Sequence, residues 1–296
     1  MDEKEVAGRL PFPHRRWPSA LLGYVVRKPL GAAGGGVLLL LTLMAIAPGL
    51  FGAGDPNAQD AARTYQPPSR DHWFGTDNFG RDLYSRVVYG ARISMYVGLL
   101  TTLIVAVVGL ALGVVSAFYG GWVDHLVQRV MDVLFTLPPL VLAMAVVYVL
   151  GPSMNNLVIA LSLPRIPRAV RVVRSVALAV RQSQYMEAAR AVGAGPLRQM
   201  LHHMAPNCLS PLIVYVTAGL GFVILTEASL SFLGLGLPPP APSWGRMLSM
   251  EALRTFEVRP WLAIFPGLAI SAAVLGANLL GDALRDLLDP RWRGRE

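Results

Sequence analysis

The chain has 296 residues, of which 54% are hydrophobic and 15% are charged, and its formal net charge is +8 at pH 7. Soluble domains carry about 25% charged residues, so this composition excludes an ordinary soluble globular domain. The single cysteine, Cys208, excludes an internal disulfide bond and a metal site built from several cysteines.

Long uncharged runs recur along the chain and predict its membrane helices. Each run reaches the roughly 20 residues that a helix needs to cross a hydrocarbon core. Backbone polar groups in lipid must be satisfied within the spanning segment, which favours helices. The sequence therefore predicts an all-α polytopic membrane protein with six transmembrane helices, over residues 30–50, 93–118, 133–150, 154–174, 208–236 and 261–281.

The N-terminal part divides into three predicted segments. These are a cytoplasmic tail over 1–28, a first transmembrane helix over 29–51 and an extracytoplasmic loop over 52–91. Ala45-x-Ala47 fits a signal-peptidase site, but Pro48 follows it directly and the uncharged run is longer than a usual signal-peptide core. We therefore expect a retained anchor.

The remainder of the chain is predicted to form the main transmembrane domain, with five helices over 92–282, and a cytoplasmic tail over 283–296. Within this domain, Pro138-Pro139 is expected to bend the start of the third span. Gly151-Pro152 is expected to end that span.

The second half of the predicted fourth span carries an arginine at every third position, namely Arg165, Arg168, Arg171 and Arg174. This spacing also occurs in voltage-sensor helices. A sensor needs acidic partners in neighbouring spans and a regular helix, whereas acids are scarce in these spans and Pro164 and Pro167 interrupt the series. We therefore expect the arginines at the cytoplasmic end of the span, leading into the next segment.

Residues 183–206 form a polar, helix-forming segment between two long uncharged runs. Gly193 and Gly195 are expected to separate two short helices, and Pro206 to end the second. Each helix has one apolar stripe at i, i+3, i+4 and i+7: Tyr185, Ala188, Ala189 and Val192 in the first, Leu197, Met200, Leu201 and Met204 in the second. Helices this short are marginal alone in water, so we expect them to dock in a groove of a partner protein. A helix pair on the lipid surface is the alternative.

Glu227 is the only acidic residue deep within an uncharged run. Intramembrane acids are often proton or ion sites, and such a site would suit a stand-alone proton-coupled carrier. A carrier that works alone needs no cytoplasmic docking segment, however. We therefore favour a structural hydrogen-bonding role for Glu227 near the outer end of the fifth span.

The distribution of lysine and arginine predicts the orientation of the chain. Of the 26 lysines and arginines, 18 lie in the segments on the same side as the two termini. By the positive-inside rule this asymmetry places both termini in the cytoplasm. The basic charge then reflects topology and contact with the lipid membrane, and no nucleic-acid partner is expected.

Several kinds of chemistry have no motif in this chain. Neither of its two lysines, Lys4 and Lys28, ends a G-x-x-x-x-G-K-[ST] phosphate-binding loop, so the chain is not expected to hydrolyse ATP or to be an enzyme on its own. The five histidines lack metal-ligand spacing, and no G-x-S-x-G nucleophile motif occurs. We expect no metal site and no cofactor bound by this chain.

Three stretches carry a family resemblance. Glu187-Ala188-Ala189-x3-Gly193 resembles the coupling-helix motif of permease subunits of ABC importers, and His203-Met204-Ala205-Pro206 resembles its ending in the peptide branch. Residues 75–94 resemble the segment before the second span of the shorter, second permease of dipeptide/oligopeptide (and nickel) importers. Residues 226–236, with Pro242-Ser243-Trp244-Gly245, resemble the fifth span and following outer loop of the same group. The resemblance covers about residues 30–290.

This resemblance implies a type I ABC importer permease fold with a cytoplasmic coupling helix, in a bacterial-type inner membrane. It implies import of di- or oligopeptides, or of nickel or another small solute, by alternating access. The implied partners are a homologous second permease, two identical or different ATPase subunits that bind ATP and Mg²⁺, and an extracytoplasmic substrate-binding protein.

The resemblance also assigns site residues. The ATPase-coupling residues are expected to be Glu187, Ala188, Ala189, Gly193, Leu197, Leu201, Met204 and Pro206. The expected docking residues for the binding protein are Asp77, Arg81, Asp82 and Trp244. The balanced charge of the outer loop suits a merely solvated loop equally well.

Overall fold

A computed structural model describes residues 29–248 and 250–288, and the predicted tail 1–28 and the end of the predicted tail 283–296 lie outside these residues. In the described residues regular structure is helical, and the only β-type pairing is an isolated bridge between Thr76 and Asp82. The expectation of an all-α chain is therefore confirmed for this part.

The helices follow one another with few long connections. They are α2 (Pro29–Ile46), α3 (Leu83–Tyr119), α4 (Gly121–Thr136), α5 (Pro139–Leu150), α6 (Met154–Ser162), α7 (Ile166–Arg181), α8 (Gln184–Ala191), α9 (Pro196–Arg198), a π-helical turn (Gln199–Met204), α10 (Ala205–Ala218), α11 (Leu220–Phe232), α12 (Trp244–Met247), α13 (Met250–Arg254) and α14 (Trp261–Leu288). Two 3-10 turns, Pro48–Phe51 and Ala61–Arg63, lie in the loop before α3.

Four helical segments are long and apolar enough to cross a membrane: Pro29–Ile46, Leu83–Tyr119, Pro196–Phe232 and Trp261–Leu288. A fifth arises if α4 and α5 are one span, bent by 93° at the expected prolines. The predicted fourth span is not one continuous helix, because it is divided between α6 and α7 at a turn that contains Pro164. The described helices thus provide four or five of the six predicted spans.

Two helix boundaries differ from the sequence-based expectation. The first predicted span, 29–51, ends early at Ile46, because the residue before Pro48 is driven out of the helical region and Ala47 adopts φ −129°. In contrast, α3 begins ten residues before the predicted 93. The Asp82 carboxylate caps it by accepting the amide of Ser85 at 2.8 Å.

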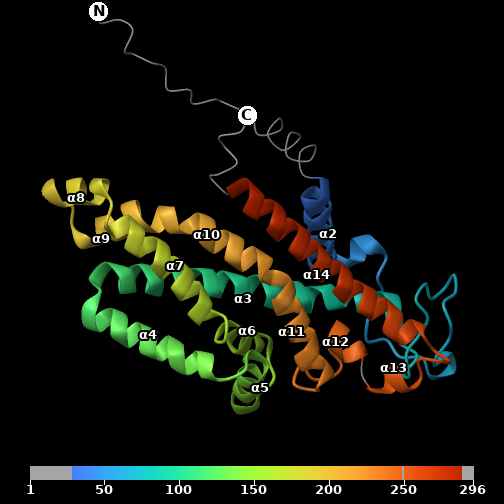
Figure 1. Ribbon diagram of the computed structural model, residues 1–296. Coiled ribbons are helices and arrows are strands. Elements are labelled where there is room, and N and C mark those ends of the chain that lie inside the picture. Colours follow the sequence, from blue (N-terminus) through green and yellow to red (C-terminus); the bar gives the residue numbers. More distant parts are fainter. Residues whose placement is uncertain (1–28, 249, 289–296) are drawn as a thin grey trace, which may run out of the picture.

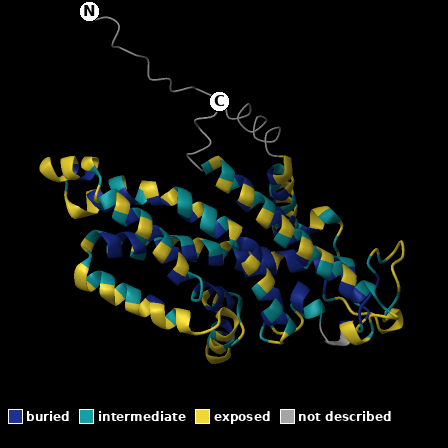
Figure 2. Ribbon diagram, viewed as in Figure 1, coloured by how far each residue is buried: buried dark blue, intermediate teal, exposed yellow. Residues whose placement is uncertain are grey.

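The helices form an elongated bundle with α3 along its interior (Figure 1). Helices α2, α6, α7, α10 and α11 all pack on α3. At one end of the bundle lie α8 and α9, and at the other lie the loop before α3 together with α12 and α13 (Figure 1). Buried residues concentrate along α3, whereas α4, α8 and the loop are largely exposed (Figure 2).

Small residues allow the closest helix contacts. A Cβ added at Gly109 or Gly113 of α3 would come within 2.6 Å of a side-chain carbon of α7, at Ala169 and Val173 respectively. In lipid there is no hydrophobic driving force between helices, so association depends on such close packing. The α3–α7 contact therefore leaves no room for larger side chains.

Helices α2 and α14 pack in the same way, and two glycines of α2 allow a test of whether this close contact stabilises the fold. A Cβ at Gly34 would lie 2.6 Å from the Gly276 carbonyl oxygen, whereas one at Gly36 meets nothing within 4 Å. We expect Gly34→Leu to lower the free energy of unfolding in detergent by about 1–3 kcal/mol, relative to Gly36→Leu. Equal stability of the two variants in a denaturant titration would contradict the packing of α2 on α14.

Candidate functional site

Residues 183–206 form an elbow at one end of the bundle (Figure 1). Helix α8 ends where Gly193 takes a left-handed conformation with φ +76°, which favours glycine. The amide of Ala194 donates to the carbonyl of Ala189 at 3.0 Å and closes the helix end. Gly195 is extended, and Pro196 is the first residue of α9. The two glycines therefore separate the helices as the sequence predicts.

The first apolar stripe differs from the expectation. Of its four predicted members only Ala189 is buried, while Tyr185 is 43% and Val192 is 84% exposed. Met186 is fully buried instead, in a cluster with Met200 and Met204. The inward face of α8 is thus shifted from the predicted one, because Met186 and Ala189 contact the bundle.

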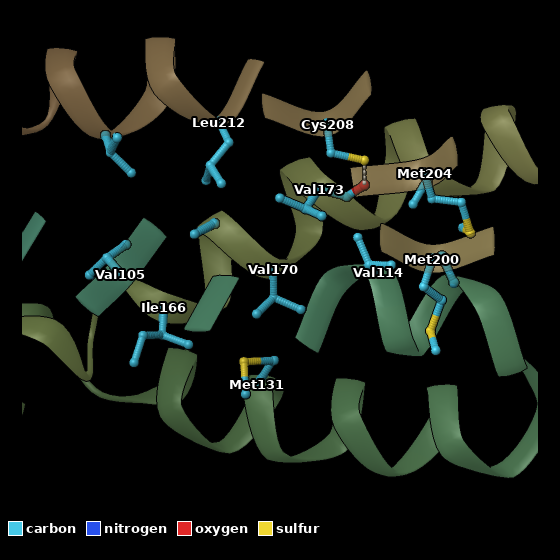
Figure 3. Packing of buried hydrophobic residues seen from close by; sticks show 14 of the residues in the cluster. Val105, Val114, Met131, Ile166, Val170, Val173, Met200, Met204, Cys208 and Leu212 are labelled. Atoms are coloured by element: carbon cyan, nitrogen blue, oxygen red, sulfur yellow. Dashed lines mark hydrogen bonds between the residues drawn. The ribbon is translucent and has the colours of Figure 1, made fainter. Parts of the chain in front are cut away.

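The second apolar stripe is divided between two surroundings. Met200 and Met204 are buried, whereas Leu197 and Leu201 are 66% and 56% exposed. Figure 3 shows Met200 and Met204 beside Val114 of α3, with Cys208 and Leu212 farther along α10. The Cys208 thiol donates to the carbonyl of Val173 in α7 at 3.7 Å (Figure 3). One side of this helix is therefore fastened to the core while the other is open.

Pro206 does not end the second helix, contrary to the prediction. A helical segment runs from Pro196 through the π-helical turn Gln199–Met204 and α10 as far as Ala218. A proline within an α-helix loses one hydrogen bond and its ring crowds the carbonyl of residue i−4. The wider turn just before it relieves this crowding, with the amide of Ala205 donating to the carbonyl of Met200. The elbow is thus continuous with a helix that enters the bundle.

Polar contacts brace the elbow against the bundle. The guanidinium of Arg181 donates to the carbonyl of Ala117 at the end of α3, at 2.9 Å. The amide of Asn207 donates to the Tyr185 hydroxyl at 3.2 Å and thereby joins α10 to α8. The first contact fixes the end of α7 that leads into the elbow, and the second ties α8 to the start of α10.

The remaining surface of the elbow is open. Glu187 and Ala188 are exposed beside Val192, Leu197 and Leu201. Within the described residues, no basic group lies at ion-pairing distance from the Glu187 carboxylate. The surface therefore combines apolar side chains with one unpaired negative charge, a pattern that suits a protein partner.

At the opposite end of the bundle, the acidic candidates stabilise the loop before α3. The Asp77 carboxylate pairs with Arg81 at 2.6 Å and accepts the amide of Phe79 at 2.9 Å. The other carboxylate, Asp82, accepts a hydrogen bond from Ser85 and lies 3.0 Å from a ring nitrogen of His72. Both acids therefore have a structural role within the loop.

Trp244 is 1% exposed and does not present a docking surface, contrary to the prediction. Its indole nitrogen donates to the carbonyl of Val87 at 2.8 Å. The ring lies over Gly90, where a Cβ would come 2.6 Å from it. The residue locks α12 onto α3, because only glycine leaves room for the ring.

The sequence-based reasoning missed a pocket of about 450 Å³ at this end. Arg81, Arg86 and Arg246 line it together with a single acid, Asp77. Arg81 and Arg86 are near neighbours in the sequence, whereas Arg246 lies about 160 residues later and reaches the pocket only through the fold. The pocket adds positive charge to this end of the bundle.

Glu227 is fully buried between three elements. Its carboxylate accepts hydrogen bonds from Ser94 of α3 at 3.1 Å, Ser231 of α11 at 2.8 Å and Ser243 before α12 at 3.3 Å. Three hydroxyl donors satisfy much of its hydrogen-bonding capacity. These contacts fit the structural role favoured from the sequence.

A pair of substitutions separates the structural role of Glu227 from a proton-carrying one. Glu227→Gln keeps a group that can hydrogen-bond the serines, so we expect normal uptake and stability. Glu227→Leu leaves buried hydroxyls without an acceptor, at a cost of about 1–3 kcal/mol for each one that finds no other partner, and should lower the unfolding midpoint. Loss of uptake in a stably folded Glu227→Gln variant would favour proton transfer.

Comparison with known proteins places the chain among transport proteins. Residues 109–294 match the family model described as "Binding-protein-dependent transport system inner membrane component". A putative peptide transport system permease of Brucella suis is 45% identical over 258 residues, which cover 87% of this chain and 86% of the relative. A dipeptide transport system permease of Alkalihalophilus pseudofirmus is 44% identical over 228 residues, 77% and 75% of the two chains. A glutathione transport system permease of Pectobacterium atrosepticum is 43% identical over 262 residues, 88% and 87%.

Proposed function

The chain belongs to the family of binding-protein-dependent transport system inner membrane components, and from this premise we propose how it works in a peptide importer. It is a multi-pass permease subunit of an ABC importer. Relatives that are named for peptides, a dipeptide and glutathione favour peptides as the cargo over nickel or another small solute.

The proposed complex has four kinds of contact for this chain. A homologous second permease completes the pathway, two ATPase subunits bind ATP and Mg²⁺ and lie beneath it, a binding protein delivers the cargo, and lipid surrounds the rest. The chain has six spans in a type I arrangement if the bent pair α4 and α5 counts as one span and α6 and α7 together count as another. The positive-inside distribution supports both termini and the elbow in the cytoplasm.

The observation that carries the proposal is the divided surface of the elbow. Met200 and Met204 hold it to the bundle, while Leu197, Leu201 and Glu187 remain open for a partner. We place this open surface in a groove of one ATPase subunit. Because the helical segment Pro196–Ala218 includes α10, movement of the ATPase at its first turns is transmitted along it into the bundle.

Transport follows from a change in contacts at the two ends. ATP binding draws the ATPase subunits together and displaces the elbow, which turns the pathway from inward-open to outward-open, and hydrolysis resets it. A ligand shifts such an equilibrium only through different contacts with the two states. The elbow is proposed to contact the ATPase subunit differently in the two states, and the hydrogen bond between Asn207 and Tyr185 links α8 to α10 so that the change reaches the bundle. At the outer end, the arginine-lined pocket and the adjoining loop form the proposed docking surface for the binding protein.

Gly193 and Gly195 offer a matched test of the elbow. An added Cβ meets nothing within 4 Å at either position, but only Gly193 has a positive φ. A β-branched residue is strained in that conformation, by at least about 1–2 kcal/mol. We expect Gly193→Thr to insert normally into the membrane but to reduce ATP-driven uptake. The reduction should be roughly tenfold, because a free-energy cost of about 1.4 kcal/mol corresponds to a factor of ten. Gly195→Thr should transport normally. Normal uptake by Gly193→Thr would refute the elbow role.

The open surface can be tested separately. Leu197→Glu places a charge where we expect the ATPase groove. It should weaken retention of the ATPase subunits by about tenfold or more, because changing a central interface residue typically costs about 2 kcal/mol of binding free energy. The control is Val258→Glu, at a side chain that is 74% exposed at the opposite end. Co-purification from detergent reports the result. Unchanged retention in Leu197→Glu would favour the alternative in which the helix pair lies on lipid.

A further inference from the structure

Arg165 lies halfway along the bundle, not at the cytoplasmic end of a span as its sequence position predicts. It occupies the turn between α6 and α7, and its guanidinium lies against Gly219, where any Cβ would overlap it. Gly219 separates the 14 residues of α10 from the 13 residues of α11. A cation is therefore held midway along a helical segment that is apolar enough to cross a membrane.

The arginine series divides into paired and unpaired members. Arg171 pairs with Asp132 at 2.6 Å and Arg174 with Asp124 at 2.5 Å, both across to α4. Within the part of the chain that the structure describes, the Arg165 and Arg168 guanidinium groups form no ion pair or hydrogen bond. The two side chains are one turn apart at the start of α7, so their unbalanced charges lie close together.

Arg165 faces aromatic rings instead of a carboxylate. Its guanidinium carbon lies 5.6 Å from the ring centre of Tyr215 and 5.7 Å from that of Phe222. Such contacts recover only a small part of the hydration that a charge loses in a membrane interior. The aromatic rings orient the guanidinium but do not neutralise it.

The surroundings of Arg165 are open to other molecules. Tyr215, Gly219 and Phe222 are spaced i, i+4 and i+7, so they share one face of α10 and α11, and Phe222 is 53% exposed. A guanidinium at this depth facing hydrocarbon is strongly unfavourable, and intramembrane charges almost always face the bundle interior or a water-filled cavity. Because part of this face is exposed, a partner for the unbalanced charge can reach it from outside the chain.

We propose that Arg165, assisted by Arg168, is a carboxylate-binding site on the translocation pathway, and that its ligand is the C-terminal carboxylate of the transported peptide. The inference rests on the proposed function. A guanidinium binds a carboxylate through two parallel hydrogen bonds, and every unmodified peptide carries that group at neutral pH. The site offsets the loss of hydration of the carboxylate as it passes the middle of the pathway, and Tyr215 and Phe222 contact apolar parts of the peptide.

The test uses the complete importer in proteoliposomes with its binding protein, and compares one peptide with its C-terminal amide. Each is supplied at a concentration that loads the binding protein to the same extent. We expect Arg165→Gln to slow uptake of the free-acid peptide about tenfold and to leave uptake of the amide nearly unchanged. Arg165→Lys, which keeps the charge without the planar fork, should lose less. Any preference of the binding protein is the same in each transporter and cancels in the ratio of the two rates.

A matched control comes from the same helix. Arg171→Gln removes a guanidinium that already has a carboxylate partner in the chain, so any effect should be equal for the two peptides. Equal slowing of both peptides by Arg165→Gln would overturn the proposed site. If Arg165→Gln also reduced co-purification of the second permease, the carboxylate that pairs with Arg165 would belong to that subunit and not to the peptide. Failure of the unmodified importer to take up either peptide with ATP would instead refute the proposed peptide cargo.

Discussion

Close approach between helices is the constraint on which the rest of this structure depends. Lipid chains are as apolar as leucine, so burial alone does not drive helices together in a membrane. Contact must come from surfaces that fit at short range, and Gly109 and Gly113 of α3 provide such a surface for α7. Because α7 leads into the elbow and begins beside Arg165, its seat on α3 positions both features.

Polar groups on the helices follow a second rule, which separates structure from function. Glu227 is surrounded by serine hydroxyls, and the carboxylates of Asp124 and Asp132 hold α4 to α7 through arginines. Each of these charges meets its partner within the chain, as expected for groups that maintain a fold. Arg165 and the elbow surface differ because they have no such partners among the residues that the structure describes, and the proposed function depends on such open positions.

Much of the fold could be predicted because long uncharged runs are a strong local signal. The runs locate α2, α14 and most of α3, and proline pairs locate the bend between α4 and α5. The first turns of α3 could not be predicted. They carry Arg86 and Arg92, whose charges are satisfied by carbonyl oxygens of the preceding segment, at Pro56 and Ala45. Such contacts join residues about thirty or more positions apart and leave no local pattern.

The candidate site was predictable in place but not in orientation. Its glycines and proline identify an elbow, since they report backbone conformation directly. The sequence does not show that Met186 is buried instead of Tyr185, because both fit an amphipathic helix and only the packing of the bundle decides between them. Trp244 and Pro206 were misread for the same reason. Their contacts, with Gly90 and with a π-helical turn, arise from tertiary structure.

Helix α3 has 37 residues, which at 1.5 Å per residue is about 55 Å. A hydrocarbon core is only about 30 Å thick, so this single rod reaches beyond it. Near its first turns, α3 accepts the hydrogen bond of Trp244, and its Ser94 donates to the buried Glu227. In its last turn, a carbonyl oxygen accepts a hydrogen bond from Arg181, which precedes the elbow. In the proposed complex, α3 therefore joins the end proposed for the binding protein to the end beside the elbow, so a displacement of one end of this helix reaches the other.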